Sequence, residues 1–288
     1  MTVVQHRPRM LQAADGDAVS CLIADDPVLH CVLDTRLRLA PDLNPHRLGG
    51  FLWGVPAGTE PVEGGQLRAA AFHGGNLIPV GGDLAALESI AQQLVRNGRS
   101  CSSIVGSADA VAAMWPVLAR RWGPARAIRL SQPLLCTESP AAVLPDPAVR
   151  RVQPDELSRF LPAATAMFSE ELDISPTGND GGRGYRNRVS ELLANGRAFA
   201  RFDEQGAVMF KAEVGALSPA TAQIQGVWVR PDLRGRGLGT AAMAAVLRFG
   251  LQLAPTVSLY VNDYNTAARR MYQRLGFTQV ATLRTVLF

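Results

Sequence analysis

The chain has 288 residues, 47% of them hydrophobic and 19% charged, and its net charge at pH 7 is +4. This length and apolar content favour two globular domains, and no apolar run approaches the roughly 20 residues that a membrane-spanning helix needs. Residues 1–10 lack the apolar core of a signal sequence, so we expect a cytoplasmic protein. The four cysteines show no zinc-ligand spacing, so we expect buried thiols, no disulfides and no metal site.

Charge is unevenly distributed along the chain. Residues 1–180 carry 15 Lys and Arg against 19 Asp and Glu, whereas residues 181–288 carry 14 against 6. A basic C-terminal part suits a polyanionic ligand. However, Lys211 is the only lysine, and the arginines form no basic run with interleaved aromatic residues, which argues against a nucleic-acid-binding surface. We therefore expect a small anionic ligand.

The N-terminal part alternates short apolar runs with amphipathic segments. We expect helices before residue 40 and then, in order, strands 51–55, 66–72 and 76–82, helix 83–98, strand 101–106, helix 108–123 and strand 125–135. A proline-rich stretch over 136–156 follows, and its composition predicts a linker.

The C-terminal part continues the alternation. We expect strand 149–153, helix 154–171, a glycine-rich loop 175–184, helix 185–196, strands 197–202, 207–218 and 221–229, helix 239–253, strand 256–262, helix 266–276 and two strands within 277–288. From residue 77 and again from residue 222 the order is β-α-β-α-β. We infer a duplicated α+β fold with domains at 1–140 and 141–288; a coincidence of two α+β layouts is the alternative.

One stretch, VWVRPDLRGRGLGT, indicates an anion site. Gly235, Gly237 and Gly239 allow a tight turn with accessible backbone N–H groups. Arg234 and Arg236 add positive charge, and the N-terminus of the next helix also favours an anion. A tight turn with solvated arginines is the structural alternative.

The same stretch does not fit two common phosphate motifs. Five residues separate the strand from Gly235, and too little chain follows for the doubly wound sheet of a dinucleotide-binding domain. A P-loop is excluded because no lysine follows the glycines. The corresponding junction of the first half, IPVGGDLAAL, carries Asp83 and no arginine, so we expect no anion site there.

Two motifs together resemble the GNAT superfamily of N-acetyltransferases. The first is Arg234-x-x-Gly237-x-Gly239, and the second is NDYNTAARRMYQRLGF, which contains Asn265 and Tyr272. The order of the elements between them also fits that family. The resemblance covers about residues 148–288, whereas the first half shows it only through the order of its elements.

This resemblance implies two tandem GNAT-like domains, each a mixed, mostly antiparallel sheet flanked by helices, with an acetyl-CoA site in the second. Backbone N–H groups of residues 235–240 would bind the pyrophosphate, and the pantetheine arm would lie between two splayed strands. The implied coenzyme-binding residues are Val227, Trp228, Val229, Arg234, Gly235, Arg236, Gly237, Leu238, Gly239, Thr240, Asn262 and Asn265.

The resemblance also implies that Tyr272 is the acid that protonates the leaving thiolate. Helix capping by Asn265 and packing by Tyr272 are the structural interpretations of the same residues. A base must deprotonate the acceptor amine. Gln223 and Gln225 stand where relatives carry glutamate, so Glu213 is the nearest candidate, although it is equally placed to pair with Lys211 on the same strand face.

Other bases stay open. They are Glu170, Glu171, Asp173, a water chain and the C-terminal carboxylate of Phe288, and Tyr260 stands at a second position where some relatives carry glutamate.

We expect an N-acetyltransferase that moves an acetyl group from acetyl-CoA to a primary amine, which is a protein lysine, a protein N-terminus or a small molecule. The alternative is a catalytically weak acyl-CoA-binding regulatory protein. A nucleic-acid-binding module is a weaker third option. We expect no membrane partner, a monomer or homodimer, and an N-terminal domain that covers the acceptor site or mediates assembly.

Overall fold

The computed structural model describes residues 7–58, 65–178 and 180–288. Two of the sequence predictions fall on residues outside this described part. They are the absence of a signal sequence, which concerns residues 1–6, and the glycine-rich loop, which includes Asn179. No helix among the described residues is both long and apolar enough to cross a bilayer.

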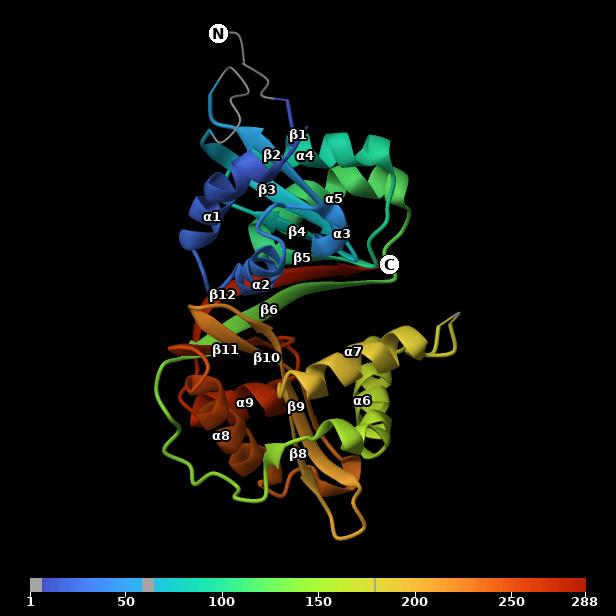
Figure 1. Ribbon diagram of the computed structural model, residues 1–288, viewed down its shortest axis with the longest axis vertical. Coiled ribbons are helices and arrows are strands. Elements are labelled where there is room, and N and C mark those ends of the chain that lie inside the picture. Colours follow the sequence, from blue (N-terminus) through green and yellow to red (C-terminus); the bar gives the residue numbers. More distant parts are fainter. Residues whose placement is uncertain (1–6, 59–64, 179) are drawn as a thin grey trace. The chain divides into compact units, whose positions relative to one another are not determined.

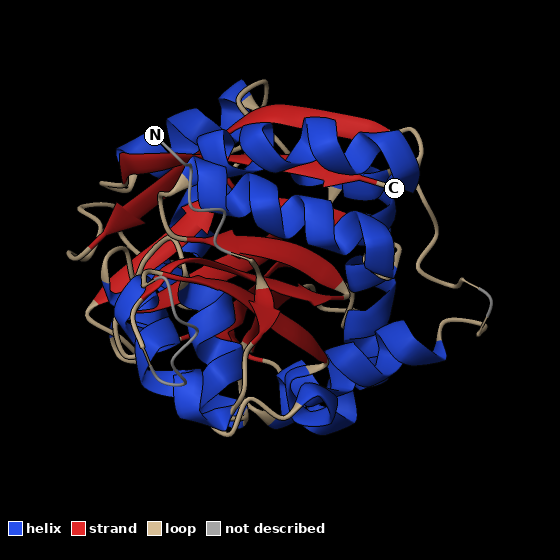
Figure 2. Ribbon diagram, turned by 90° about the horizontal axis from the view of Figure 1, so that it is seen from above, coloured by secondary structure: helices blue, strands red, loops and turns tan. Residues whose placement is uncertain are grey.

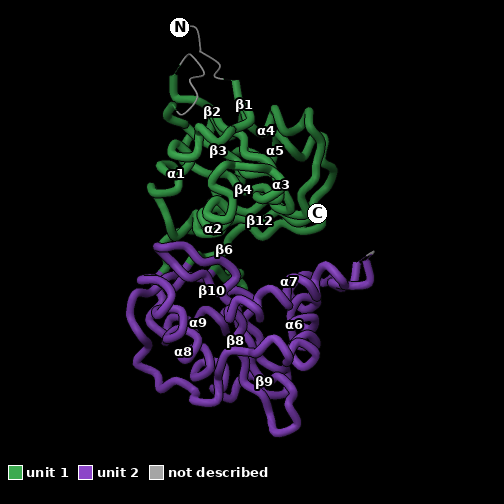
Figure 3. The backbone as a smooth tube through the Cα atoms, viewed as in Figure 1, with its two compact units in different colours: residues 1–134, 260–264, 279–288 green, residues 135–259, 265–278 purple. Residues whose placement is uncertain are grey.

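The chain forms two compact units (Figure 1 and Figure 3). Unit 1 contains residues 1–134, 260–264 and 279–288, and unit 2 contains residues 135–259 and 265–278. The units follow contacts rather than chain order, so the domain boundary expected between residues 140 and 141 stays a prediction.

Unit 1 is built on a mixed, mostly antiparallel sheet with strand order β1-β2-β3-β4-β5-β12-β6. Its strands are β1 (Arg9–Met10), β2 (Gly50–Pro56), β3 (Leu67–Gly74), β4 (Asn76–Val80), β5 (Ser103–Ser107), most of β6 (Ala127–Thr137) and most of β12 (Thr278–Leu287). Its helices are α1 (Gly16–Ala24), α2 (Cys31–Leu39), α3 (Pro45–Leu48), α4 (Leu84–Asn97) and α5 (Ala108–Trp122). β4 and β5 run parallel, and helices flank the strands (Figure 2). The expectation of buried thiols is wrong for Cys21 of α1, which is exposed.

Helix α4 illustrates why these segments fold as the sequence predicts. Leu87, Ile90, Ala91 and Leu94 recur at helical spacing and are completely buried in one apolar cluster of unit 1. The helix ends before Gly98, whose φ of +81° favours glycine. The amphipathic pattern and the terminating glycine therefore fix both the type and the end of this element.

Unit 2 has the strand order β11-β10-β9-β8-β7. Its strands are β7 (Arg150–Arg151), β8 (Ala198–Phe202), β9 (Val208–Leu217), β10 (Thr221–Val229) and most of β11 (Thr256–Tyr260). Its helices are α6 (Leu157–Leu172), α7 (Arg183–Ala194), α8 (Leu238–Leu251) and α9 (Thr266–Arg274). β10 and β11 are parallel, and the other recorded pairs are antiparallel.

The two faces of the unit 2 sheet pack against different helices. On one face, Phe160 of α6 joins Ala198 and Trp228 in an apolar cluster. On the other face, Phe199 of β8 stacks on Phe249 of α8, with ring centroids 5.0 Å apart. Residues 198 and 199 serve opposite faces because side chains alternate along a strand.

Both units begin with the same local arrangement, which supports the inferred duplication. In unit 1 the Arg9 guanidinium donates twice to the Asp15 carboxylate, at 2.7 and 2.6 Å. In unit 2 Arg150 donates twice to Glu156, at 2.7 and 2.8 Å. Each pair follows the spacing R-x-x-Q-x-x-D/E, and in each the glutamine and the acidic residue form a capping box around a short 3-10 helix.

The expectation of two strands within 277–288 is wrong. The structure has one strand, β12, which pairs antiparallel with β5 of unit 1 from Leu283↔Ser107 to Leu287↔Ser103. Residues 278–288 contain no Gly, Pro, Asn or Asp, so the segment lacks the residues that a hairpin turn requires. The chain therefore leaves unit 2 after α9 and ends in the sheet of unit 1.

The proline-rich stretch expected to be a linker is held against unit 2. The Asp146 N–H donates to the Ala241 carbonyl at 2.9 Å. The Asp146 carboxylate, which is buried, accepts from Arg201 at 2.5 Å and from the Ala148 N–H at 2.9 Å. The prolines prevent regular secondary structure here, but hydrogen bonds still hold the segment to unit 2, so it is not a free linker.

Candidate functional site

The junction between β10 and α8 has the backbone conformation that its glycines permit. Gly235 and Gly237 have φ of +76° and +81°, and a Cβ added at either would meet no atom within 4 Å. These two glycines are therefore needed for their conformation. Gly239 is needed for space, because its Cβ would lie 3.1 Å from Val229 Cγ2 and 3.5 Å from Met271 Sδ.

Backbone donors at this junction are open to a ligand. Helix α8 starts after Gly237, which has no side chain to cap it. Within the described part of the chain, no protein acceptor is recorded for the N–H groups of residues 235–239. Arg236 beside them is exposed and has no recorded partner among the described residues. Unpaired donors and a helix N-terminus together favour an anion.

Arg234, by contrast, holds the loop in place. Its Nη2 lies 2.6 Å from Glu170 Oε2 and its Nε donates to the Val229 carbonyl at 2.9 Å. Glu170, at the end of α6, also accepts from Trp228 Nε1 at 3.0 Å. Burial raises the pKa of Glu170, but the bonds from Arg234 and Trp228 outweigh it and the pKa is lowered. Arg234 therefore braces the loop against α6.

Strands β10 and β11 diverge beside this loop. Their parallel pairing runs from Thr221↔Thr256 to Gln223↔Ser258, and no pair is recorded beyond it in the described chain. β10 nevertheless continues to Val229. The backbone of residues 224–229, which includes the predicted contacts Val227, Trp228 and Val229, thus has no strand partner on the β11 side. The Trp228 side chain is turned into the α6 cluster, and Trp228 pairs with Lys211 of β9 on the opposite edge of β10.

On its other edge β10 carries a bulge. Gln225 pairs with Glu213 and Trp228 with Lys211, so β10 has one residue more than β9 at this point. Gly226 within the bulge has φ of +58°. A Cβ there would lie 2.8 Å from Lys211 Nζ and 3.2 Å from Glu213 Cδ, so the bulge closely covers this pair.

Glu213 lies between two cations. Lys211 Nζ is 3.4 Å from Glu213 Oε2, and Arg188 Nη2 of α7 is 3.5 Å from Oε1. Lys211 is completely buried, whereas the Arg188 side chain is 55% exposed. Burial lowers the pKa of Lys211 more than the nearby carboxylate raises it. The pairing of Glu213 with Lys211 that the strand spacing allowed is therefore present.

Helix α9 carries the other predicted residues. Asn265 caps it, because its side-chain oxygen accepts from the Ala268 N–H at 3.1 Å. Tyr272 is 5% exposed and packs edge-on against Phe277, with centroids 5.8 Å apart. Burial, with a smaller contribution from the Glu171 charge, raises the pKa of Tyr272 above its ordinary value. The phenol thus stays protonated at neutral pH.

Asn262 lies in unit 1, unlike the rest of the predicted set. Its side-chain oxygen accepts from Gln132 Nε2 at 2.9 Å, and Thr285 donates to Gln132 Oε1 at 2.5 Å. The side-chain oxygen of Asn262 thus takes part in a polar network of unit 1.

Residues 186–277 match the family model described as acetyltransferase (GNAT) family. That range contains the β10–α8 junction, the diverging strands and α9. The chain carries a GNAT acetyltransferase domain. Residues 50–160 match a second model, described as a domain of unknown function, DUF4081.

A mycothiol acetyltransferase of Mycobacterium leprae is 40% identical over 72 residues, which is 23% of this chain and 23% of that protein. The match thus spans about a quarter of that relative. Among solved structures, a Drosophila protein covers 98% of both chains at 14% identity with a TM-score of 0.69. An acetyltransferase from the GNAT family of Colwellia psychrerythraea covers 98% of this chain and 99% of its own at 12% identity, with a TM-score of 0.58.

A tandem GNAT protein from the clavulanic acid biosynthesis pathway also covers 98% of both chains, at 16% identity and a TM-score of 0.50. At these identities the likeness shows the fold, and it extends over both units. The expected tandem architecture is therefore confirmed.

The remaining acidic groups of the GNAT domain differ in how far they are engaged. Glu170 is bound to Arg234 and Trp228. The Glu171 charge acts on both Tyr272 and Lys211.

The sequence analysis did not predict the bulge in β10, although an isolated glycine such as Gly226 in a strand pattern is its usual signal.

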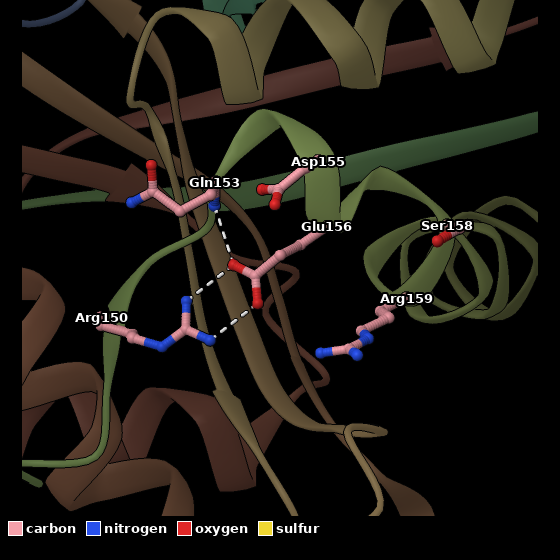
Figure 4. A pocket seen from close by; sticks show the side chains of 6 residues that line it. All are labelled: Arg150, Gln153, Asp155, Glu156, Ser158 and Arg159. Carbon is pink, nitrogen blue, oxygen red and sulfur yellow. Dashed lines mark hydrogen bonds and ion pairs between the residues drawn. The ribbon is translucent and has the colours of Figure 1, made fainter.

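An open hollow of about 610 Å³ lies at the start of α6 (Figure 4). Its lining residues are Arg150, Gln153, Asp155, Glu156, Ser158 and Arg159. Glu156 accepts from Arg150 and from the Gln153 N–H at 2.9 Å, and the Arg150 bond is the main reason that the pKa of Glu156 falls to about 2. Because both oxygens of the Glu156 carboxylate already accept hydrogen bonds, Glu156 is not a free catalytic carboxylate in this hollow. No group of His, Cys, Asp and Glu suited to a metal occurs in the described part of the chain.

Proposed function

We propose that this protein is an acetyl-CoA-dependent N-acetyltransferase that acts on a primary amine. The β10–α8 junction carries the proposal. There the N–H groups of residues 235–239 have no recorded acceptor among the described residues, and two glycines take the positive φ that the turn requires. These N–H groups would bind the pyrophosphate, and the exposed Arg236 would add charge. Thr240 stays a proposed contact, although its N–H donates to the Gly237 carbonyl at 3.1 Å. Leu238 and Gly239 would contribute through their backbone.

The pantetheine arm would lie along the unpaired edge of β10. Val227 and Val229 offer backbone groups that β11 does not use, although the Val229 carbonyl already accepts from Arg234. Asn265 and Asn262 stay proposed coenzyme contacts. An N–H near Val229 would stabilise the oxyanion of the tetrahedral adduct.

The transfer would proceed by direct attack, with proximity supplying much of the acceleration. The protonated acceptor amine gives one proton to Glu213, and its lone pair attacks the thioester carbonyl carbon. The C–S bond then breaks, the thiolate takes a proton from Tyr272, and Tyr272 regains one from the amide nitrogen. The products are the N-acetylated amine, coenzyme A and a proton on Glu213 that passes to solvent.

The acceptor belongs to the same proposal. Protein lysines, protein N-termini and small molecules are candidates, and the partial similarity to a mycothiol acetyltransferase adds weight to a small molecule. A cytoplasmic location and a monomeric or homodimeric state stay predictions.

Calorimetry with acetyl-CoA and thiol release with a panel of amines test this function. Gly237→Val should weaken acetyl-CoA binding by about a hundredfold or more, because charge-assisted hydrogen bonds of roughly 1.5–3 kcal/mol each are lost. Gly206→Val is the matched control, because Gly206 also has φ of +81° but lies in the β8–β9 turn. Equal affinities in wild type and Gly237→Val would contradict the proposal, and NAD should not compete.

An acyl-CoA-binding regulator is the second candidate. It is favoured by Gln223 and Gln225, which occupy the strand positions where a base is expected and bond to each other at 3.1 Å. Tight acetyl-CoA binding without coenzyme A release from any amine would select this function instead.

A further inference from the structure

Lys211 is a completely buried charge that the proposed reaction does not use. It is the only lysine in the sequence, and its side chain has no exposed surface. Burying an ammonium is costly unless it is paired. A chain that uses arginine at every other basic position has thus kept its single amine side chain beneath the β10 bulge.

The surroundings of Lys211 couple it to Glu213 more closely than to any other group. On β8 the paired residues are Ala200 and Ala198, which bring no charge. On β10 the covering residue is Gly226. On α6 the Phe160 ring lies 5.5 Å from Nζ.

Charged or titratable groups of the helices act on this pair, namely Glu171, Arg188 and Tyr185. Glu171 of α6 and Arg188 of α7 act on Lys211 electrostatically, while Glu170 of α6 is bonded to Trp228 and Arg234. Tyr185 of α7 donates its hydroxyl to the Ala164 carbonyl at 2.8 Å, and burial raises its pKa to about 12. Tyr185 therefore stays neutral and adds no charge.

The charges of this cluster balance only when Lys211 is protonated. Arg188 and Lys211 then offset Glu171 and Glu213. Removing the ammonium would leave Glu213 buried beside Arg188 alone.

We propose, on the basis of the proposed acetyl transfer, that Lys211 is a positioning residue: its ammonium holds the Glu213 carboxylate beneath the β10 bulge, where that carboxylate receives the acceptor's proton. Lys211 itself touches no substrate. Its loss should change the pH dependence of turnover without changing acetyl-CoA affinity.

A single lysine makes the coupling directly measurable. Growth with lysine labelled with ¹⁵N at Nζ gives one side-chain NMR signal in the full chain, which can be titrated with pH. Glu213→Gln should lower the titration midpoint of that signal by about one pH unit or more, because the stabilising negative charge is gone. Acetyl-CoA should shift the signal in wild type. Equal midpoints in the two proteins, or no response to acetyl-CoA, would overturn the proposal.

Turnover then separates positioning from packing. Lys211→Met should keep acetyl-CoA affinity within about twofold, lower kcat about tenfold or more and move the acidic limb of the pH–rate profile upward by about one unit. Lys211→Arg, which restores the charge, should move the limb back. Arg186→Met on α7 is the control, because Arg186 is exposed with no recorded partner among the described residues.

Two outcomes point to different errors. If wild type releases no coenzyme A with any amine, the proposed function fails. If wild type is active and Lys211→Met has the same pH profile and kcat as wild type, only the proposed role of Lys211 fails. Should Lys211→Met not fold, Lys211→Met/Glu213→Gln removes both charges and leaves no unpaired carboxylate. If the double variant loses as much kcat as Glu213→Gln alone, the proposal is supported. If the double variant loses much more kcat than Glu213→Gln, the proposal is overturned.

Discussion

The strand–helix junctions of the two units have the same layout and opposite chemistry. In unit 1 the N-terminus of α4 is capped by Asp83, which accepts from the Ala86 N–H at 3.0 Å and pairs with Arg68 at 2.5 Å. In unit 2 the N-terminus of α8 has only Gly237 as its cap. One helix is thus capped by a carboxylate, and the other has no side-chain cap and is proposed to bind an anionic ligand.

The parallel strands beside these junctions differ as well. β4 and β5 pair only at Asn76↔Ser103 and Leu77↔Ile104, so they also diverge early. In unit 1, however, Pro79 occupies the space: a Cβ on Gly106 of β5 would lie 2.6 Å from Pro79 Cγ. We infer that in unit 1 Asp83 and Pro79 occupy the positions where unit 2 is proposed to bind the pyrophosphate and the pantetheine arm.

The largest effect is expected at Tyr272 of α9, whereas α5, the corresponding helix of unit 1, has no tyrosine. Tyr272→Phe should lower kcat roughly 10²–10⁴-fold, the usual contribution of general acid catalysis. Acetyl-CoA affinity should hardly change, because phenylalanine keeps the packing against Phe277. Steady-state kinetics with calorimetry measure both, and a near wild-type kcat would leave Tyr272 as a packing residue.

The next effect transplants the cap of unit 1 into unit 2. Gly237→Asp places a carboxylate where the pyrophosphate is proposed to bind. Two like charges about 4 Å apart cost roughly 4 kcal/mol near a protein surface, so affinity for acetyl-CoA should fall about a hundredfold or more. Gly237→Asn is the matched control, because it has the same shape and backbone strain without the charge. If Asn weakens binding as much as Asp, charge is not the reason.

A smaller effect tests unit 1 alone. Asp83→Ala removes the cap of α4 and should lower the free energy of unfolding by about 1 kcal/mol. It should not create a second acetyl-CoA site, because Pro79 still fills the strand gap. Chemical denaturation and binding stoichiometry check the two claims, with the exposed Glu88→Ala on the same helix as control. Two coenzymes bound per chain, in wild type or variant, would refute the comparison.

The smallest effect concerns the ion pair that opens unit 2 (Figure 4). The pKa of Glu156 is lowered from 4.5 to about 2, so its contribution to stability is present above about pH 4.5 and is lost as the pH falls towards 2. Glu156→Gln should flatten that part of the plot of melting temperature against pH. The free energy of unfolding that is lost should be less than about 1 kcal/mol, because Arg150 is half exposed. An unchanged acid slope would show that the pair contributes nothing.

Local signals in the sequence predicted most of the fold. β10 was expected at 221–229 and spans Thr221–Val229, and the helix-capping role of Asn265 also follows from local chemistry. The pairing of β12 with β5 was not predictable in this way, because strand partners are set by contacts distant in sequence. The brace from Arg234 to Glu170, 64 residues earlier, and the complete burial of Lys211 depend on tertiary packing for the same reason.

The place of β12 has a consequence for how the chain folds as it is made. Domains usually fold in the order of their synthesis. Here the sheet of unit 1 has β12 between β5 and β6, so its interior stays incomplete until residues 279–288 have left the ribosome. Unit 2, whose last residue is Thr278, can close first. The N-terminal unit would then be the last to finish, and a chain shortened to end at residue 278 should leave its β5 edge available to a chaperone.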